Sequence, residues 1–201
     1  MRILKDDTNN AILQAARKEF IDKGFKEASM RNIAKDAQVG LSNIYNYFRN
    51  KDEIFLAIVK PAKEKLFAFV TEQHATPMDF TACTPLGHNE ESVEYYIKLI
   101  FEYKEEYRLL LYHSQGSSME HFRNIFTDHI TEVSNRFMTL ENQYYPDAHK
   151  VSDFFIHAMS SWMTSILGEM VTHDMNKQKI RDFFYEYFRF SFAGWRELTG
   201  L

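Results

Sequence analysis

Hydrogen-bonding side chains gather in one short segment near the amino terminus of the 201-residue chain. Residues 29–51 are typical of two short helices joined by a tight turn, and the second helix, Leu41 to Phe48, would bury Ile44 and Phe48 one turn apart. Its outer face would carry Ser42, Asn43, Tyr45, Asn46 and Tyr47. Amides and hydroxyls on an element narrow enough for a major groove suit base edges and phosphates. The segment therefore predicts a DNA-reading helix-turn-helix.

The first helix of the pair is expected to begin at Ser29, whose side chain would cap the free N–H groups. Its apolar stripe would consist of Met30, Ile33, Ala34 and Ala37. A preceding helix is predicted from about Asn9 to Lys23, ended by Gly24, with an inner face of Ile12, Ala16 and Phe20.

A long fourth helix should follow, with Asn50 as its cap and Pro61 inside it. Proline removes one helical hydrogen bond, so we expect a kink at this point. The kink has two interpretations, which are a bend that only fits the packing and a hinge that transmits movement.

The first fifty-five residues contain several dispersed segments that resemble one known family. Residues 11–25 (AILQAARKEFIDKGF), 30–34 (MRNIA), 44–48 (IYNYF) and 51–55 (KDEIF) resemble, in order and spacing, the amino-terminal signature of TetR-family transcriptional regulators. The resemblance covers about a quarter of the chain. It implies an all-α protein of about nine helices, with a DNA-binding head at residues 1–50 and a ligand-binding and dimerisation body at residues 51–201.

Three residues depart from the family pattern. Gln38 stands where glycine is usual, Gly40 where Ser or Thr caps the second helix, and Leu41 where a basic or polar residue is common. Gln38 must then adopt a turn conformation that glycine would adopt more easily. Leu41 either packs on Ile44 and Phe48 or touches a thymine methyl group. These departures leave open an alternative, a helical small-molecule or partner-binding module that has lost DNA reading.

The resemblance implies a regulator, in particular a repressor, that binds a palindromic operator in double-stranded DNA as a homodimer and leaves it when a small ligand binds. We expect Asn43, Asn46 and Ser42 at base edges and Met30 near the DNA backbone. The expected phosphate contacts are Tyr45, Tyr47, Arg31 and Lys51.

Composition and charge fit this interpretation. The net charge is −4, but residues 1–50 hold nine Lys and Arg against six acids, so the head is +3 and the remainder −7. Cys83 is the only cysteine, and neither a signal peptide nor a membrane-spanning run is evident, so we expect the cytoplasm. We expect no metal, cofactor or catalytic site, because His113, Glu120 and His121 straddle a predicted break and lack zinc-motif spacing.

The body should hold five more helices, at about 92–104, 106–114, 119–144, 148–173 and 177–199, after a loop at 76–91. A pocket for an apolar or aromatic ligand is the family expectation. The candidate lining is Tyr96, Ile100, Tyr103, Tyr112, Phe122, Phe126, His129, Phe155, Met159 and Trp162. Each of these taken singly also fits a core position.

The last two helices are predicted to form the dimer interface. Small residues at helical spacing allow close approach of another helix, and the last helix is aromatic almost all round, which calls for a second partner. The predicted interface comprises His157, Ser161, Ser165, Gly168, Phe184, Tyr187, Phe188, Ser191 and Trp195. The alternative is that the aromatic helix is buried within one subunit.

Overall fold

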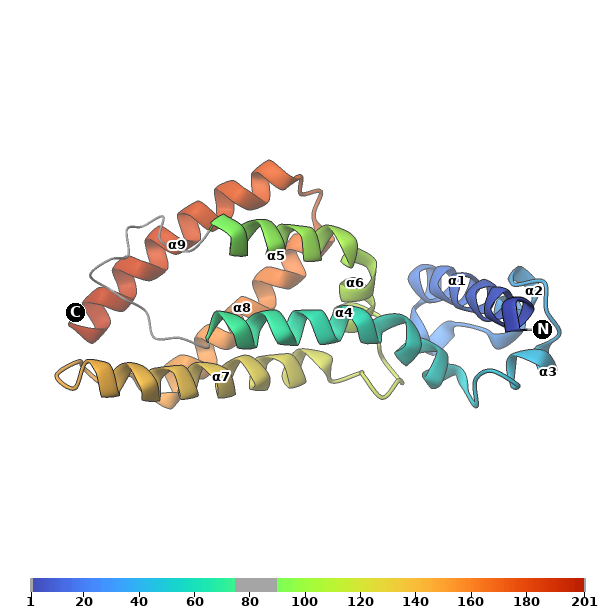
Figure 1. Cartoon of the computed structure of the whole chain (residues 1–201), viewed down its shortest axis with the longest axis horizontal. Coiled ribbons are helices and arrows are strands. Elements are labelled where there is room, and N and C mark those ends of the chain that lie inside the picture. Colours follow the sequence, from blue (N-terminus) through green and yellow to red (C-terminus); the bar gives the residue numbers. More distant parts are fainter. Residues whose placement is uncertain (1, 75–89, 201) are drawn as a thin grey trace. The chain divides into compact units, whose positions relative to one another are not determined.

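The computed structural model describes residues 2–74 and 90–200, and these form nine helices and no strand. The helices are α1 (Arg2–Glu27), α2 (Met30–Asp36), α3 (Leu41–Ile44), α4 (Lys51–Gln73), α5 (Glu90–Glu102), α6 (Lys104–Tyr112), α7 (Phe122–Tyr144), α8 (Asp153–Thr172) and α9 (Lys177–Thr199) (Figure 1). The all-α prediction is confirmed. Most of the predicted loop at 76–91, with Cys83, lies outside the described residues.

The chain divides into two compact units that each contain segments distant in sequence. Unit 1 comprises Met1–Glu64 and Glu105–Arg123, and unit 2 comprises Lys65–Lys104 and Asn124–Leu201. We predicted a boundary at residue 50 from the sequence. The two compact units meet inside α4, and the amino-terminal unit also includes most of α6; the boundary between a DNA-binding head and a body stays a prediction.

Unit 1 is built around the inner face predicted for the first helix. Ile12, Ala16 and Phe20 are completely buried. The rings of Phe20, Phe25 and Phe55 pack with centroids 5.2–5.8 Å apart. Gly24 leaves helical geometry at φ 74°, as expected of the residue predicted to end this helix.

The start of α4 has the predicted cap. The Asn50 side-chain oxygen accepts the backbone N–H of Glu53 at 2.8 Å, and the Glu53 carboxylate accepts the N–H of Arg49 at 2.6 Å. These reciprocal bonds satisfy donors that a helix start leaves free. The helix then continues through Pro61 to Gln73 without interruption.

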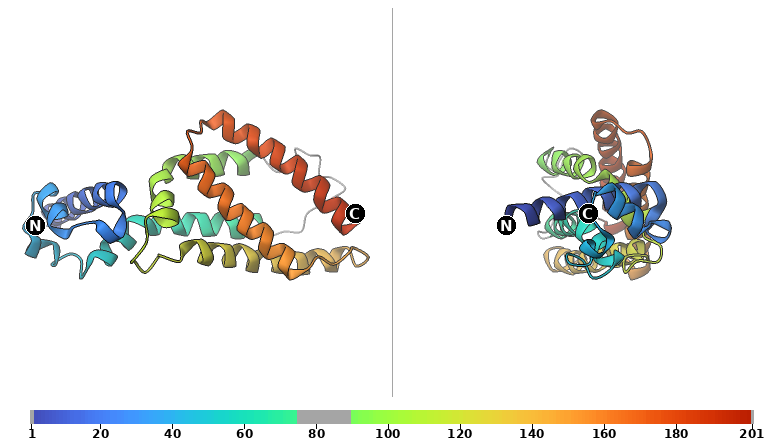
Figure 2. Two further views of the ribbon diagram at one scale, coloured as in Figure 1. Left: turned by 180° about the vertical axis from the view of Figure 1, so that it is seen from behind. Right: turned by 90° about the vertical axis from the view of Figure 1, so that its right-hand side faces the viewer.

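Unit 2 consists of the second half of α4 with α5, α7, α8 and α9 (Figure 2). The α4 segment and α7 run side by side, joined by the stacking of Phe67 on His129 at 4.4 Å. Helices α8 and α9 diverge from their short connection at residues 173–176. None of the described helices is long and apolar enough to cross a membrane.

Candidate nucleic-acid interface and ligand cavity

Helices α2 and α3 and the turn between them have helix-turn-helix geometry. α2 buries Ile33 and Ala34, and Ile44 of α3 is fully buried. The turn contains Gln38 at φ 56°, the one non-glycine residue with positive φ among the described residues. This is the conformation that the departure from glycine predicted.

The second helix of the motif is shorter than predicted. α3 ends at Ile44 instead of Phe48, and the backbone continues as a turn in which the N–H of Tyr47 bonds to the Ile44 carbonyl at 2.9 Å. Phe48 is still buried, and its N–H also reaches the Ile44 carbonyl at 3.0 Å. Residues 45–47 therefore form a tight turn that keeps the predicted inner pair together.

Polar side chains lie on the outer side of this motif, as the spacing predicts. Ser42, Asn46 and Arg31 are exposed, and the Tyr45 side chain is 52% exposed. Asn43, Tyr47 and Met30 are partly exposed. The Asn46 amide donates to the Asn43 side-chain oxygen at 3.2 Å, which holds two hydrogen-bonding groups next to each other on this surface.

The start of α2 is capped differently from the prediction. The Ser29 side chain makes no capping hydrogen bond. Instead the Glu19 carboxylate of α1 accepts the backbone N–H of Ser29, the Asn32 amide and the Lys23 ammonium, each at 3.0 Å. Burial alone would raise the pKa of Glu19, but the hydrogen bonds from Ser29, Asn32 and Lys23 lower it below its ordinary value. This carboxylate fixes the first helix of the motif on α1.

Lys51 has a structural environment that its sequence motif did not predict. Its ammonium donates to three backbone carbonyls at the end of α1, those of Phe25 at 2.6 Å, Ala28 at 3.0 Å and Lys26 at 3.1 Å. The same ammonium lies 4.6 Å from the centroid of the Phe25 ring. Because an ammonium has three N–H donors, all of them are engaged. Burial lowers the pKa of Lys51.

Residues 105–123 are attached to the rest of unit 1 by polar contacts. The Arg17 guanidinium pairs with the buried Glu106 carboxylate at 2.6 Å, and this contact raises the pKa of Arg17. The backbone N–H of Ser118 donates to Asp52 at 2.8 Å. The N–H of Phe25 donates to the His113 carbonyl at 2.8 Å. Helix α6 is therefore bound to α1 through Glu106, and the segment that follows α6 is bound to α1 through His113 and to the start of α4 through Ser118.

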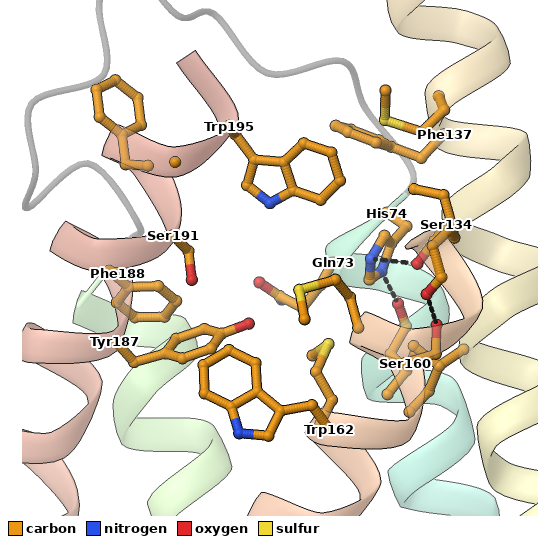
Figure 3. Close-up of a pocket in the computed structure, with 18 of the residues that line it drawn as sticks. Gln73, His74, Ser134, Phe137, Ser160, Trp162, Tyr187, Phe188, Ser191 and Trp195 are labelled. Carbon is orange, nitrogen blue, oxygen red and sulfur yellow. Dashed lines mark hydrogen bonds between the residues drawn. The ribbon is translucent and has the colours of Figure 1, made fainter. Parts of the chain in front are cut away.

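Unit 2 contains a cavity of about 650 Å³ lined by residues of α4, α5, α7, α8 and α9 (Figure 3). This volume falls in the range of small-molecule sites. Aromatic side chains dominate the wall, and the figure shows the rings of Trp162, Tyr187, Phe188 and Trp195 around the opening between helices.

Half of the predicted pocket residues line this cavity, namely Tyr96, Phe126, Phe155, Met159 and Trp162. Two of the others, Tyr112 and Phe122, belong to unit 1. Ile100 is a buried core residue. His129 is held by Thr71 at 3.2 Å and by stacking on Phe67, as a hydrogen-bonded packing histidine. Tyr103, partly exposed, is also absent from the wall.

The residues predicted for the dimer interface separate into two groups. Phe184, Tyr187, Phe188, Ser191 and Trp195 of α9 line the cavity of their own chain. On α8, His157 and Ser161 are exposed and Ser165 is partly exposed, whereas Gly168 is buried. A neighbouring residue, Phe154, is 79% exposed. The α8 stripe thus remains available for a partner.

Sequence reasoning missed several polar residues of the cavity. Gln73 is the last residue of α4 and His74 follows it, and Ser134 and Glu141 come from α7. The signal was present, because 126, 130, 134, 137 and 141 are spaced along one face of a helix. The His74 ring bonds to the Val70 carbonyl at 2.8 Å and to the Ser134 hydroxyl at 3.4 Å (Figure 3).

Ionisable groups in the wall are shifted toward their neutral forms. Burial lowers the pKa of His74 and raises the pKa of Tyr96. Burial also raises the pKa of Tyr187, although the hydrogen bond with Ser191 opposes that shift. At neutral pH these three side chains are therefore uncharged hydrogen-bonding groups.

Comparisons with known proteins agree with the helix-turn-helix. Residues 12–58 match the family model described as bacterial regulatory proteins of the tetR family. The chain is 43% identical over 63 residues to the uncharacterised HTH-type transcriptional regulator YhgD of Bacillus subtilis, which is 29% of this chain and 33% of that protein. It is 27% identical over 132 residues to the HTH-type transcriptional activator FasR of Mycolicibacterium smegmatis, which is 65% of this chain and 51% of that protein. The matches thus span a third to a half of these curated relatives.

The fold is similar to solved structures over nearly its whole length. A bacterial regulatory protein of the tetR family from Rhodococcus RHA1 has a TM-score of 0.64 and 19% sequence identity, covering 94% of this chain and 96% of that one. At this identity the likeness concerns the fold.

Proposed function

We propose that this chain, which belongs to the TetR family of bacterial regulatory proteins, is a DNA-binding transcriptional regulator that reads a palindromic operator as a homodimer. The observation that carries the proposal is the helix-turn-helix in unit 1, with Asn43 and Asn46 adjacent on its exposed side. Asparagine amides pair well with adenine edges in the major groove.

The contacts on DNA follow from exposure and chemistry. Asn43, Asn46 and Ser42 meet base edges, while Arg31, Tyr45 and Tyr47 meet phosphates and Met30 lies near the backbone. Lys51 is removed from the phosphate contacts expected from the sequence, because its three donors bind carbonyls at the end of α1. Its part is to position α1 and α4 beside the reading motif.

Dimerisation uses the exposed stripe of α8. One short recognition helix contacts few base pairs. A two-fold dimer doubles the number of base pairs contacted, and its symmetry matches that of a palindrome. The stripe contains His157 and the small residues Ser161 and Ser165, next to the exposed apolar ring of Phe154; small residues allow another helix to approach closely, and the ring supplies apolar area to bury. Analytical ultracentrifugation at micromolar concentration should give a dimer, and a monomer would contradict this part.

Ligand control would operate through the cavity in unit 2. Without ligand, the two recognition helices of the dimer sit about one DNA turn apart, roughly 35 Å, and dock in successive major grooves. A ligand that prefers a conformation with another spacing shifts the population away from DNA by its differential affinity. This gives a ligand-released repressor.

Selection of bound sequences from a random DNA pool at physiological salt tests the DNA-reading proposal. Recovery of a palindromic motif is the expected result. Weak, salt-sensitive binding without a motif would contradict it and favour a binding module that has lost DNA reading.

A further inference from the structure

The part of the helix-turn-helix that would enter the major groove has no charged side chain. This reading segment comprises residues 40–48, which are the N-cap of α3, α3 itself and the turn that follows it. We infer that the reading segment selects A·T base pairs, with Asn46 on an adenine and Leu41 on a thymine methyl group in each half-site. The inference deepens the DNA-reading part of the proposed function and rests on it.

The composition of the reading segment disfavours G·C pairs. In the major groove guanine presents two acceptors, N7 and O6, to which Arg or Lys is the usual donor, and cytosine presents an N4 donor that Asp or Glu accepts. None of these four residue types occurs at positions 40–48. The exposed cations nearest in sequence, Lys35 and Arg49, precede and follow the segment. A G·C pair would therefore find neither of its usual partners in the reading segment.

The hydrogen bond between Asn46 and Asn43 leaves a donor and an acceptor for adenine. The Asn46 amide gives one N–H to the Asn43 side-chain oxygen at 3.2 Å. Because an amide has two N–H donors and an oxygen, the second N–H and the oxygen of the exposed Asn46 remain for a base. Adenine presents the matching pair, the N7 acceptor beside the N6 donor. Guanine has the acceptor O6 in place of that donor, so its oxygen would face the Asn46 oxygen with no proton between them.

Leu41 supplies apolar surface for the methyl group of thymine. Its neighbours on the inner face, Ile44 and Phe48, are 0% and 8% exposed, whereas Leu41 itself is partly exposed and precedes the exposed Ser42. Packing against the core thus leaves apolar area of Leu41 in contact with water. Burying that area against a thymine methyl group is favourable, and it selects the same base pair as an amide on adenine does.

Selection from a random DNA pool with the unaltered protein, Leu41→Ala and Asn46→Ala tests the inference. The positions at which a variant loses base preference are the positions that its missing side chain reads, and we expect A·T pairs there. A palindrome with G·C pairs at those positions would overturn the inference and leave the proposed function intact. Recovery of no motif would overturn the proposed function, and the inference with it.

Base analogues in the recovered operator test the two contacts directly. 7-Deazaadenine lacks the N7 acceptor and deoxyuridine lacks the methyl group of thymine, and both keep the normal base pairing. In fluorescence anisotropy, 7-deazaadenine at one position of each half-site should weaken binding about tenfold. Deoxyuridine at one position should weaken it about fourfold, the effect of exposing one buried methyl group. Insensitivity to either analogue at every position would overturn the inference.

The two variants serve as controls for each other. Leu41→Ala should lose the sensitivity to deoxyuridine and keep the sensitivity to 7-deazaadenine, and Asn46→Ala should show the reverse. A variant that keeps both sensitivities would overturn the assignment of its residue and so the inference. Circular dichroism checks that both variants fold. If Leu41→Ala does not fold, Leu41→Gln takes its place, because glutamine keeps the length of the side chain and removes its apolar end.

Discussion

The Lys51 ammonium donates a 2.6 Å hydrogen bond to the Phe25 carbonyl oxygen, which joins the start of α4 to the end of α1. Two further carbonyls, of Lys26 and Ala28, bind the same ammonium. The last carbonyls of a helix have no partner within it, and a cation there also complements the helix dipole. Lys51 thus acts as a cap supplied by another helix, in the unit that carries the reading motif.

Replacing Lys51 by methionine should lower stability more than it alters DNA electrostatics. Methionine keeps the apolar stem, but three carbonyls lose their donor, so we expect a loss of about 1–2 kcal/mol in the free energy of unfolding. Urea titration measures this loss. The slope of log affinity against log salt should stay unchanged. A slope reduced by about one with unaltered stability would instead make Lys51 a phosphate contact.

Glu19 should make the stability of unit 1 depend on acidity. Its pKa is lower in the folded chain than its ordinary value of 4.5, so its stabilisation is fully present above that value and is lost as the pH falls through the folded pKa. Glu19→Gln should lower the free energy of unfolding by about 2 kcal/mol at pH 7. This difference in stability from the unaltered protein should shrink below about pH 4.5. Chemical unfolding at several pH values measures both. Glu64→Gln is the control, since its side chain is 64% exposed, and a difference independent of pH would contradict the assignment.

Replacing Gln38 by glycine should make the folded protein more stable. A side chain at φ 56° is strained because its Cβ approaches the following carbonyl, and glycine has no Cβ. Gln38→Gly should raise the free energy of unfolding by about 1 kcal/mol. Gln38→Ala keeps the strain and should leave it nearly unchanged. Urea midpoints compare the three proteins, and a glycine variant no more stable than the alanine variant would show that the turn carries no strain.

The sequence predicted elements better than contacts. Periodicity placed the last helix at residues 177–199, as observed, and identified Ile12, Ala16 and Phe20 as an inner face. These features depend on neighbours within one helix. The prediction that the Ser29 side chain caps α2 is wrong, because the Glu19 carboxylate, ten residues earlier in the chain, accepts the backbone N–H of Ser29. Tertiary packing creates this hydrogen bond, so no local sequence pattern reveals it.

The same limit applies to the cavity. Spacing correctly indicates that the side chains of Phe122 and Phe126 turn inward, and both are buried. Phe122 nevertheless belongs to unit 1, whereas Phe126 lines the cavity of unit 2. An apolar stripe on one helix indicates which residues are buried. It does not indicate which other helix packs against them. The same holds for the aromatic residues of α9, several of which line the cavity of their own chain; their part in a dimer interface stays a prediction.

The roles on DNA are separable by comparing Asn46→Ala with Arg31→Ala. Asn46 is exposed beside Asn43, so its loss should relax base preference at one position of each half-site, by about 1–3 kcal/mol of discrimination. Arg31 is exposed on α2, so its loss should weaken binding to all sequences alike and reduce the salt slope by about one. Binding assays on the selected operator and on single-base variants, at several salt concentrations, measure both effects. A changed base preference in Arg31→Ala, or a changed salt slope with intact preference in Asn46→Ala, would exchange the two assignments.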